Sequence, residues 1–425
     1  MFSQYFKQAF YLLKENKLLS FISIAGTAFS IAMIMVVVIK FRSQTASFAP
    51  EVNRERSLVF QWAGYQRRDN PNWQSNGPVS YQTAKECFKD LTIPEAVTIY
   101  RDKETMLASE KNGPKMSCDV QQTDEAFWQI FEFAFVTGKP YDLADFESGL
   151  AKAVISEAVA REVFGTTDAV GRSILLNHTE YIVCGVVKNV SMLADKAYAQ
   201  VWIPMSSTNA LTDTWADGVM GDVRVVILAR SKADFPAIRE ESEMLRKKYS
   251  ESLPHHDMLF RDQPDTYFVA SLRTSANNYP RVKEAVRMHI IIIIVLLLVP
   301  AINLSGLTLS RMRKRLSEIG LRKAFGASRN ELMIQILSEN MLYSILGGIF
   351  GLILSYIGVY FMADMLFGSS WNSSLQGENQ LSATFLLSPT VFFLAFLFCF
   401  VLNLLSAGIP AWRTSRKNIT DSLNS

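Results

Sequence analysis

The residues whose side chains are best suited to bind a partner lie in the basic segment 310–333, between two long apolar runs. This segment contains seven Lys or Arg residues and two Glu residues. Guanidinium and ammonium groups form strong charge-assisted hydrogen bonds to carboxylates, so a cluster of them suits an acidic partner surface. Short loops rich in Lys and Arg are retained on the cytoplasmic side of a membrane. We therefore expect segment 310–333 to be a cytoplasmic loop that contacts an acidic partner.

The order of residue types in this segment predicts a helix, a stop and a second helix. Gly326 stands where a helix often ends in a left-handed glycine. Ser328 and Glu331 form the Ser-x-x-Glu pattern of a capping box, which predicts that a new helix begins there. We expect this helix–stop–helix of segment 310–333, called the elbow below, to be ordered and to lie at the inner face of the membrane. The alternative is a basic loop that touches only lipid headgroups.

Other reactive residue types occur without the spacing that catalysis or metal binding requires. Gly138-Lys139-Pro140 lacks the earlier glycine and the following Ser or Thr of a phosphate-binding loop. In His255-His256-Asp257, neighbouring side chains on a strand would point to opposite faces, which argues against a metal site. No G-x-S-x-G nucleophile motif occurs in the chain. We predict a non-catalytic chain that itself binds no metal or cofactor.

The cysteines and the net charge exclude further classes of protein. Cys399 lies in a predicted membrane segment, whereas Cys87, Cys118 and Cys184 lie in the large soluble segment. Their spacings match no zinc site, and three thiols make no disulfide framework. We expect free buried thiols, with a Cys87–Cys118 disulfide as the alternative. The net charge of +3 gives no indication of nucleic-acid binding.

Four uncharged apolar stretches, at 18–39, 290–310, 341–363 and 390–411, are long enough to cross a bilayer, which needs about 20 residues. We assign transmembrane helices to residues 18–41, 288–310, 334–363 and 389–411. The first segment is longer than the apolar part of a secretory signal peptide, so we expect it to be retained as an anchor. The apolar cores contain no ionisable residue, which argues against a proton or sodium pathway. The energy for any transport must then come from another molecule.

The distribution of Lys and Arg sets the orientation. Residues 1–17 have the pattern of an amphipathic helix on the inner membrane surface, or of a simple cytoplasmic extension of the first span. The tail 412–425 is also basic, whereas the connection 364–388 contains no Lys or Arg. The positive-inside rule places both termini and the loop 311–333 in the cytoplasm. Residues 43–287 and 364–388 are then extracytoplasmic.

The large soluble segment, residues 43–287, reads as an α+β domain. Two strand–helix–strand units flank a middle region, which predicts one compact domain with an inserted subdomain at about residues 130–210. Strands are expected at 58–62, 96–101, 153–155, 181–187, 200–203, 223–228 and 256–261. Helices are expected at 79–90, 123–130 (with Thr123 as its cap), 156–164 (capped by Ser156 and ended by Gly165) and 234–249.

Small residues recur at four-residue spacing in the third membrane segment, at Gly347, Gly351 and Ser355. Such stripes allow helix backbones to approach closely, so we expect these residues to pack against another membrane helix. Gly26 and Ser30 give the first segment a weaker stripe. The alternative is the general enrichment of glycine in membrane helices.

The residues Ser317-Glu318-Ile319-Gly320-Leu321-Arg322-Lys323-Ala324-Phe325-Gly326-Ala327-Ser328 strongly resemble the cytoplasmic motif of FtsX-like permeases of the MacB type. Downstream, Glu339, Gly347-Gly348 and Gly351 are similar to the family's third span, and Pro410-Ala411-Trp412-Arg413 to the end of its fourth. Residues 138–204 contain further short matches to the family's periplasmic core domain. The chain departs from the family at Ile419, where a proline is usual, and matches only loosely at 50–120.

The resemblance implies a permease subunit that pairs with an identical or a different second permease. Each subunit would dock a cytoplasmic ABC ATPase on a separate polypeptide, which would bind ATP and Mg²⁺. Coupling would fall on the elbow, at about residues 315–328. The residues expected to contact the ATPase or shape the elbow are Glu318, Ile319, Gly320, Leu321, Arg322, Lys323, Gly326 and Ser328.

The resemblance further implies mechanotransmission in a bacterial inner membrane, in which ATP turnover on one side moves the domain on the other. The substrate would be an exported peptide, antibiotic or similar molecule, and a periplasmic adaptor or outer-membrane partner is possible. The alternatives are a lipoprotein-releasing permease subunit and a membrane-anchored sensor or scaffold that transports nothing. An ATPase partner would separate the transporter hypotheses from the scaffold.

Overall fold

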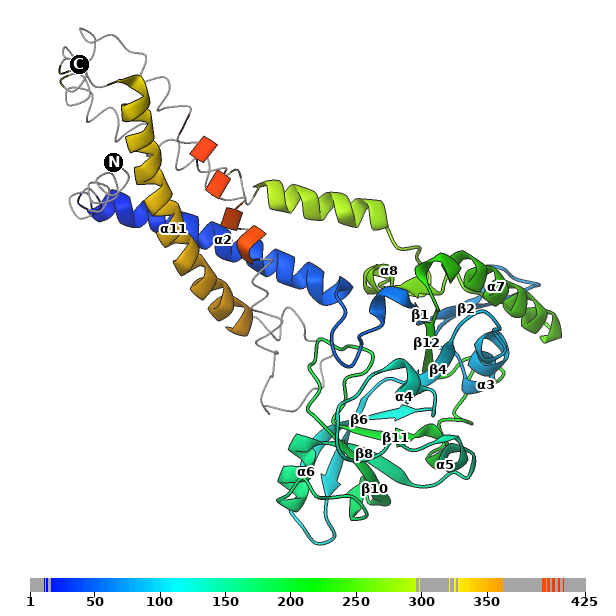
Figure 1. The fold of residues 1–425 in the computed structure, drawn as a ribbon. Helices are drawn as coiled ribbons and strands as arrows, with labels where there is room; N and C mark the ends of the chain where they lie inside the picture. The colour runs from blue at the N-terminus through cyan, green and yellow to red at the C-terminus, as the bar shows by residue number, and fades with distance from the viewer. Residues whose placement is uncertain are drawn as a thin grey trace. The chain divides into compact units, whose positions relative to one another are not determined.

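The computed structural model describes residues 17–295 and 328–361 continuously, together with residues 11, 13, 298, 321, 325, 392–394, 396, 397, 400, 401, 404, 405 and 408. The chain divides into two compact units (Figure 1). The helical unit comprises Met1–Phe41, Lys283–Gly368 and Ala383–Ser425. The α/β unit comprises Arg42–Val282 and Ser369–Ser382.

The helical unit contains the two described helices that are long and apolar enough to cross a bilayer. These are α2 (Lys17–Thr45), whose last residues belong to the α/β unit, and α11 (Arg329–Phe361). Their apolar stretches are Ser20–Thr45 and Asn340–Gly358. Residues 282–295 are also helical. The rest of the predicted second span, and most of the predicted fourth, lie outside the described residues.

The α/β unit is built on an eleven-stranded sheet with the strand order β11-β8-β10-β9-β5-β6-β4-β12-β1-β14, and β7 pairs with β10. The strands that precede the predicted insertion are β1 (Ser57–Phe60), β4 (Ala96–Arg101), β5 (Glu104–Ser109) and β6 (Met116–Thr123). Those within it are β7 (Phe135–Gly138), β8 (Lys152–Ser156), β9 (Ser173–Leu176), β10 (Thr179–Val187) and β11 (Val201–Pro204). β12 (Val223–Leu228) and β14 (Asp265–Thr266) follow. The expected α+β fold is confirmed.

One end of the sheet closes on itself. β11 pairs with both β8 and β6, so β6, β11, β8, β10, β9 and β5 form a ring of six paired strands. Alternate residues such as Val201 and Ile203 pack with α6 (Glu157–Phe164) in one apolar cluster, whereas Trp202 belongs to another. The barrel thus combines strands from the predicted insertion with β5 and β6, which precede it. Closure removes the exposed edges that an open sheet would leave.

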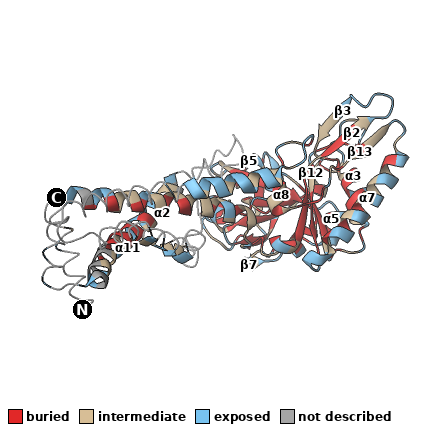
Figure 2. Cartoon of the chain, turned by 90° about the horizontal axis from the view of Figure 1, so that it is seen from above, coloured by how far each residue is buried: buried red, intermediate tan, exposed pale blue. Residues whose placement is uncertain are grey.

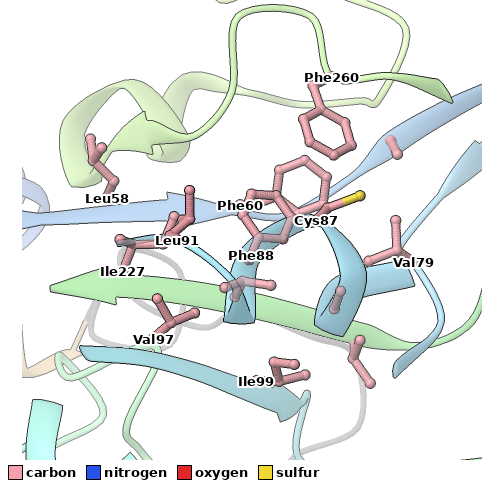
Figure 3. Close-up of a cluster of buried hydrophobic side chains, with 14 of the residues drawn as sticks. Leu58, Phe60, Val79, Cys87, Phe88, Leu91, Val97, Ile99, Ile227 and Phe260 are labelled. Carbon is pink, nitrogen blue, oxygen red and sulfur yellow. The ribbon is translucent and has the colours of Figure 1, made fainter. Parts of the chain in front are cut away.

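The other end of the sheet separates two apolar clusters. Leu58 and Phe60 of β1 pack in a cluster with Phe88 and Phe260, whereas Val59 between them faces a second cluster (Figure 3). β4 and β12 alternate in the same way, as expected for a strand whose successive side chains point to opposite faces. Burial follows the strands of this sheet, and the outward face of α7 is exposed (Figure 2).

Short helices complete the α/β unit. Those before β7 are η1 (Arg54–Arg56), α3 (Tyr81–Ala84), η2 (Lys85–Lys89) and α4 (Phe127–Ile130). Those after it are α5 (Leu143–Glu147), α6, η3 (Met205–Ser207), η4 (Lys232–Asp234), α7 (Phe235–Ser252) and α8 (Tyr267–Leu272). A separate three-stranded sheet has the order β13-β2-β3, from β2 (Ala63–Arg67), β3 (Gln74–Gly77) and β13 (His256–Leu259).

Several predicted elements need correction. The helix expected at 123–130 begins only at Phe127, because Thr123 ends β6; Asp124 instead accepts the Phe127 N–H at 3.2 Å. The strand expected at 256–261 ends at Leu259, and Arg261 has a positive φ of 49°. The β2–β3 hairpin was not expected. By contrast, Ser156 caps α6 and Gly165 ends it in the left-handed conformation, as predicted.

Candidate coupling site

The elbow of the basic segment is described at Leu321, Phe325 and the start of α11. The Ser328 N–H donates to Glu331 Oε2 at 2.8 Å, and the Glu331 N–H donates to Ser328 Oγ at 3.3 Å. Both halves of the predicted capping box are therefore present, and α11 begins at the next residue, Arg329. The Ser328 N–H and hydroxyl hold the pKa of the Glu331 carboxyl below its usual range. The prediction of a new helix at Ser328 is confirmed.

Two apolar side chains of the elbow are exposed. Leu321 is 53% exposed and Phe325 is 85% exposed, and the Phe325 N–H donates to the Leu321 carbonyl at 3.0 Å, as in a helical turn. Exposed large apolar side chains in a basic loop are typical of contact surfaces. Phe325 was not among the predicted contact residues, although an aromatic residue in a basic segment was a usable signal. Glu318, Ile319, Gly320, Arg322, Lys323 and Gly326 lie outside the described residues.

The glycine stripe of α11 lies against α2. A Cβ added to Gly347 would come within 2.7 Å of Thr27 Cβ, and one added to Gly351 would come within 2.9 Å of both the Ala28 carbonyl and Ile31 Cβ. Because real Cβ atoms do not approach that closely, these positions require glycine. The Thr27 hydroxyl bonds to the Ser23 carbonyl at 2.9 Å in its own helix, and its methyl group faces Gly347.

The other predicted packing residue, Ser355, behaves differently. It is buried, but its hydroxyl donates to the Leu352 carbonyl of its own helix at 2.7 Å. A buried hydrogen bond between Ser20 and Tyr343, at 3.1 Å, links α2 and α11 nearer their starts. The contacting positions therefore increase together along both helices, which means that α2 and α11 run parallel.

The histidines and cysteines singled out in the sequence have structural surroundings in the part of the chain that the structure describes. No group of three His, Cys, Asp or Glu side chains there could hold a metal ion. His256 stacks on Tyr65, with ring centroids 4.1 Å apart, and so has a packing role. Cys87, Cys118 and Cys184 are free, and burial raises the pKa of the Cys87 and Cys118 thiols to about 12. These thiols carry little nucleophilic thiolate at neutral pH.

The motif Gly138-Lys139-Pro140 has a conformational role. Gly138 ends β7 with a φ of 71°, and an added Cβ would come within 2.9 Å of the Gly185 Cα in β10. The Lys139 N–H donates to the Cys184 carbonyl at 3.1 Å. Glycine is needed here because two backbones approach at a left-handed residue.

Comparison with known proteins identifies both parts of the chain. Residues 20–245 match the family model of the MacB-like periplasmic core domain. Residues 290–419 match that of the FtsX-like permease C-terminal region.

Individual relatives are named as ABC transporter proteins or permeases. The chain is 22% identical over 376 residues to the macrolide export ATP-binding/permease protein MacB of Chlorobaculum tepidum, covering 87% of this chain and 55% of that protein. It is 24% identical over 264 residues to the ABC transporter permease YknZ of Bacillus subtilis, covering 60% and 62%. The chain thus spans about half the length of that MacB relative.

Among solved structures, the periplasmic region of MacB from Actinobacillus actinomycetemcomitans aligns with a TM-score of 0.33 and 13% identity. That alignment covers 47% of this chain and 88% of the other. Since one family model alone matches more than half of the chain and the second matches most of the remainder, the chain belongs to the family of FtsX-like permeases with a MacB-like periplasmic core domain.

Proposed function

We propose that this chain is the permease subunit of an ABC transporter in a bacterial cytoplasmic membrane. It would convert ATP hydrolysis by a cytoplasmic ABC ATPase into movement of the α/β unit on the other side. The observation that carries the proposal is the capped elbow: in a chain of this family, a basic segment presents exposed Leu321 and Phe325 just before a helix fixed by Ser328 and Glu331.

The elbow residues divide into three roles under this proposal. Leu321, Phe325 and Ile319 insert apolar side chains into the ATPase. Arg322 and Lys323 form charge-assisted hydrogen bonds with its acidic groups, while Glu318 pairs with a basic one. Gly320, Gly326 and Ser328 give the turn its shape. Exposed apolar anchors surrounded by charged side chains are typical of energetically important contacts in protein interfaces.

Within the membrane we propose four transmembrane helices, with both termini and the elbow in the cytoplasm. The parallel contact of α2 and α11 supports this topology. If α2 runs outward, a parallel α11 also runs outward, so the chain must return across the membrane between them. The apolar segment 288–310 is the proposed return.

For the assembly, we propose that two permease subunits pair, and that a peptide, an antibiotic or a similar amphipathic molecule is exported. The MacB relatives that match are named for macrolide export. ATP is the proposed energy source because the apolar cores of the predicted spans contain no ionisable side chain to carry a proton.

The test is a charge reversal in the elbow. The double variant Arg322→Glu and Lys323→Glu should lower ATPase co-purification about tenfold or more, because removing one partner of an interfacial charge pair costs about 2 kcal/mol or more. Export should fall with it. The matched control, Arg313→Glu with Lys314→Glu, makes the same change of charge in the same basic segment and should retain the ATPase. Unchanged co-purification and unchanged ATP stimulation in the Arg322 and Lys323 variant would refute the proposal.

A further inference from the structure

Two arginines are deeply buried where the α/β unit begins and ends. Arg54 lies just after α2 and is 5% exposed, and Arg273 lies just after α8 and is 4% exposed. Each pairs with a buried carboxylate, Glu51 and Asp265 respectively. Among the ion pairs of the described residues, these are the two in which both side chains are less than a tenth exposed. Burying a guanidinium is costly, so the surroundings must supply partners.

The Arg54 guanidinium holds the end of α2. Its Nη1 donates to the Ser43 carbonyl at 2.7 Å and to the Ala46 carbonyl at 3.2 Å. Ser43 lies in the last turn of α2, where backbone carbonyls lack helical partners, so Arg54 caps this helix. Its Nη2 donates to the Leu193 carbonyl at 2.5 Å, and the guanidinium lies 5.1 Å from the ring centroid of Tyr267 in α8.

Glu51 extends the same contact deeper into the α/β unit. It is 1% exposed, and its Oε1 accepts the N–H groups of Lys196 and Ala197 at 2.7 and 3.0 Å. Ala197 belongs to the apolar cluster that also contains Trp202 and Val226. The pair of Arg54 and Glu51 therefore ties the end of α2 to the core of the sheet.

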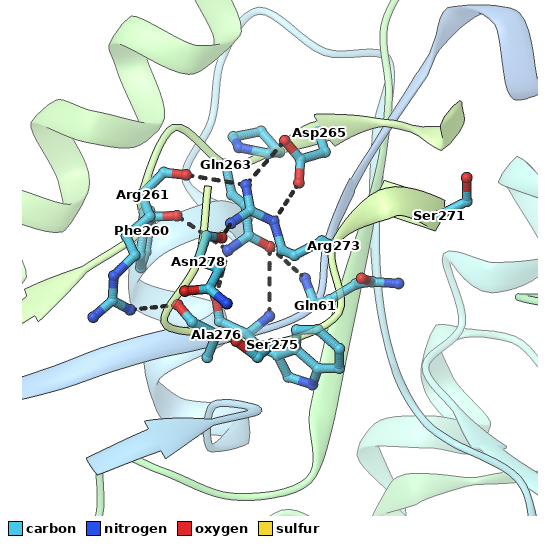
Figure 4. A network of polar contacts seen from close by, with 12 residues as sticks. Gln61, Phe260, Arg261, Gln263, Asp265, Ser271, Arg273, Ser275, Ala276 and Asn278 are labelled. Atoms are coloured by element: carbon cyan, nitrogen blue, oxygen red, sulfur yellow. Dashed lines mark hydrogen bonds and ion pairs between the residues drawn. The ribbon is translucent and has the colours of Figure 1, made fainter. Parts of the chain in front are cut away.

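Arg273 makes the corresponding contacts at the other connection (Figure 4). It binds Asp265 through Nε at 2.7 Å, and it donates to the Arg261 carbonyl and the Asn278 carbonyl at 3.0 Å each. Arg261 in turn donates to the Ala276 carbonyl at 2.5 Å. The segment between α8 and the helix that begins at residue 282 is thus held at two carbonyls.

A neighbouring amide, that of Gln263 in the segment between β13 and β14, bonds to the residues that directly follow β1. Gln263 accepts the Gln61 N–H at 3.0 Å, and its amide donates to the carbonyls of Trp62 and Phe260 at 2.5 and 3.0 Å (Figure 4). Because a buried ion pair adds little stability compared with an apolar pair of the same shape, stability alone does not explain Arg54 and Arg273. What an apolar pair cannot supply is the set of directed bonds to carbonyls.

We propose that Arg54 and Arg273 are positioning residues that fix both connecting segments of the α/β unit to its core, so that movement of the membrane helices is transmitted and not absorbed at these connections. This inference rests on the proposed function. Without the two guanidiniums, residues 43–46 and 273–280 become hinges, since a few residues at element ends absorb most of a domain movement.

The test uses variants that remove the carbonyl bonds without leaving a buried charge. These are Arg54→Met with Glu51→Gln, and Arg273→Met with Asp265→Asn. The Gln side chain at position 51 keeps an acceptor for the N–H groups of Lys196 and Ala197, and Asn at position 265 is the neutral isostere of the carboxylate. As the matched control, Arg246→Met removes a guanidinium of α7 that pairs with Glu243 and donates to the Met258 carbonyl, away from both connections. Arg54→Lys keeps the charge but not the planar fork of the guanidinium. Its effect should therefore lie between those of the wild type and the Arg54→Met double variant.

Two measurements on the full complex in nanodiscs decide the outcome. Spin labels carried by unnatural amino acids at Phe29 of α2 and at Lys111, both exposed, report the width of the intramolecular distance distribution by pulsed EPR. ATP hydrolysis is measured on the same samples. The double variants at Arg54 and Arg273 should broaden the distribution about twofold and retain ATP hydrolysis, as expected for new hinges. Export, measured separately in cells, should be lost. Arg246→Met should leave the width unchanged.

The inference is overturned if the distance distribution keeps its width in the double variants at Arg54 and Arg273, or if Arg246→Met broadens it equally. Failure of the proposed function looks different. In that case no ATPase accompanies the wild-type chain, whereas the width of the distance distribution still reports on the two arginines.

Discussion

The two units hold themselves together in opposite ways. In the α/β unit, strands such as β1 and β12 place alternate apolar residues on two clusters, so burial of side chains provides the stability. In the helical unit, α2 and α11 meet at Gly347 and Gly351, where the absence of a side chain on α11 lets Thr27, Ala28 and Ile31 of α2 approach its backbone. Lipid is as apolar as leucine, so close backbone packing takes the place of the hydrophobic effect. The two units should therefore be sensitive to opposite kinds of substitution. Removing side-chain atoms should destabilise the α/β unit, and adding them should destabilise the helical unit.

The largest effect is expected from removing atoms in the α/β unit. Phe60 packs on Phe88 and Phe260 with ring centroids 4.7 and 4.6 Å apart (Figure 3). Phe60→Ala should destabilise the α/β unit by about 3–5 kcal/mol, because it removes a buried ring and leaves a cavity. Hydrogen–deuterium exchange of the full chain in detergent should show faster exchange in β1, β4 and β12.

The control for this variant is Trp73→Ala, which removes an aromatic ring that is 43% exposed. It should change exchange little. Loss of protection in α2 and α11 as large as that in β1 would contradict the separation of the two units.

The next largest effect is expected from adding atoms in the helical unit. Gly351→Leu should destabilise the contact of α11 with α2 by about 1–3 kcal/mol, because overpacking forces helices apart. The matched control is Gly358→Leu in the same helix, where an added Cβ meets no atom of the described residues within 4 Å. Thermal unfolding in detergent should show a lower midpoint for the Gly351 variant than for the Gly358 variant. Equal midpoints would show that the close approach has no energetic role.

The sequence predicts what local chemistry decides. Ser156, Gly165 and the Ser328–Glu331 box each act on backbone groups within a few residues, and all three were predicted correctly. Short runs rich in apolar, β-prone residues likewise located β1, β4 and β12 within two residues. Such signals do not depend on the rest of the fold.

Features that depend on distant segments were not predictable in this way. Closure of the barrel pairs Val120 with Val201, and Arg54 binds a carbonyl 139 residues away, at Leu193. Neither pairing leaves a pattern in the local sequence. The β2–β3 hairpin was missed because β3 consists of polar residues and glycine, which have no apolar alternation. The cap of α4 was assigned to Thr123 because Thr and Asp124 are both good caps, and only the sheet shows that Thr123 is a strand residue.

A smaller effect is expected at the elbow, where a single cap fixes the start of α11. Ser328→Ala removes the acceptor for the Glu331 N–H and should cost about 1 kcal/mol of local stability. Amide exchange should accelerate in residues 329–333, and ATP stimulation should fall. Ser338→Ala is the control, because its hydroxyl bonds to the Ile334 carbonyl within the helix and caps nothing. Equal acceleration in both variants would remove the special role of the cap.

The smallest effect is the dependence of the same cap on pH. The hydrogen bonds from Ser328 lower the pKa of Glu331 from its ordinary value of 4.5. A carboxyl whose pKa is lower in the folded state stabilises that state above the unfolded value and loses the stabilisation as pH falls through the folded one. Protection of residues 329–333, corrected for intrinsic exchange, should therefore be constant above pH 5 and decrease below the ordinary glutamate value. Glu331→Gln keeps an acceptor without the charge and should abolish this dependence, since only the ionised carboxylate titrates. If the variant and the wild type lose protection in parallel, another carboxyl controls the elbow, and the capping box then contributes geometry but no charge.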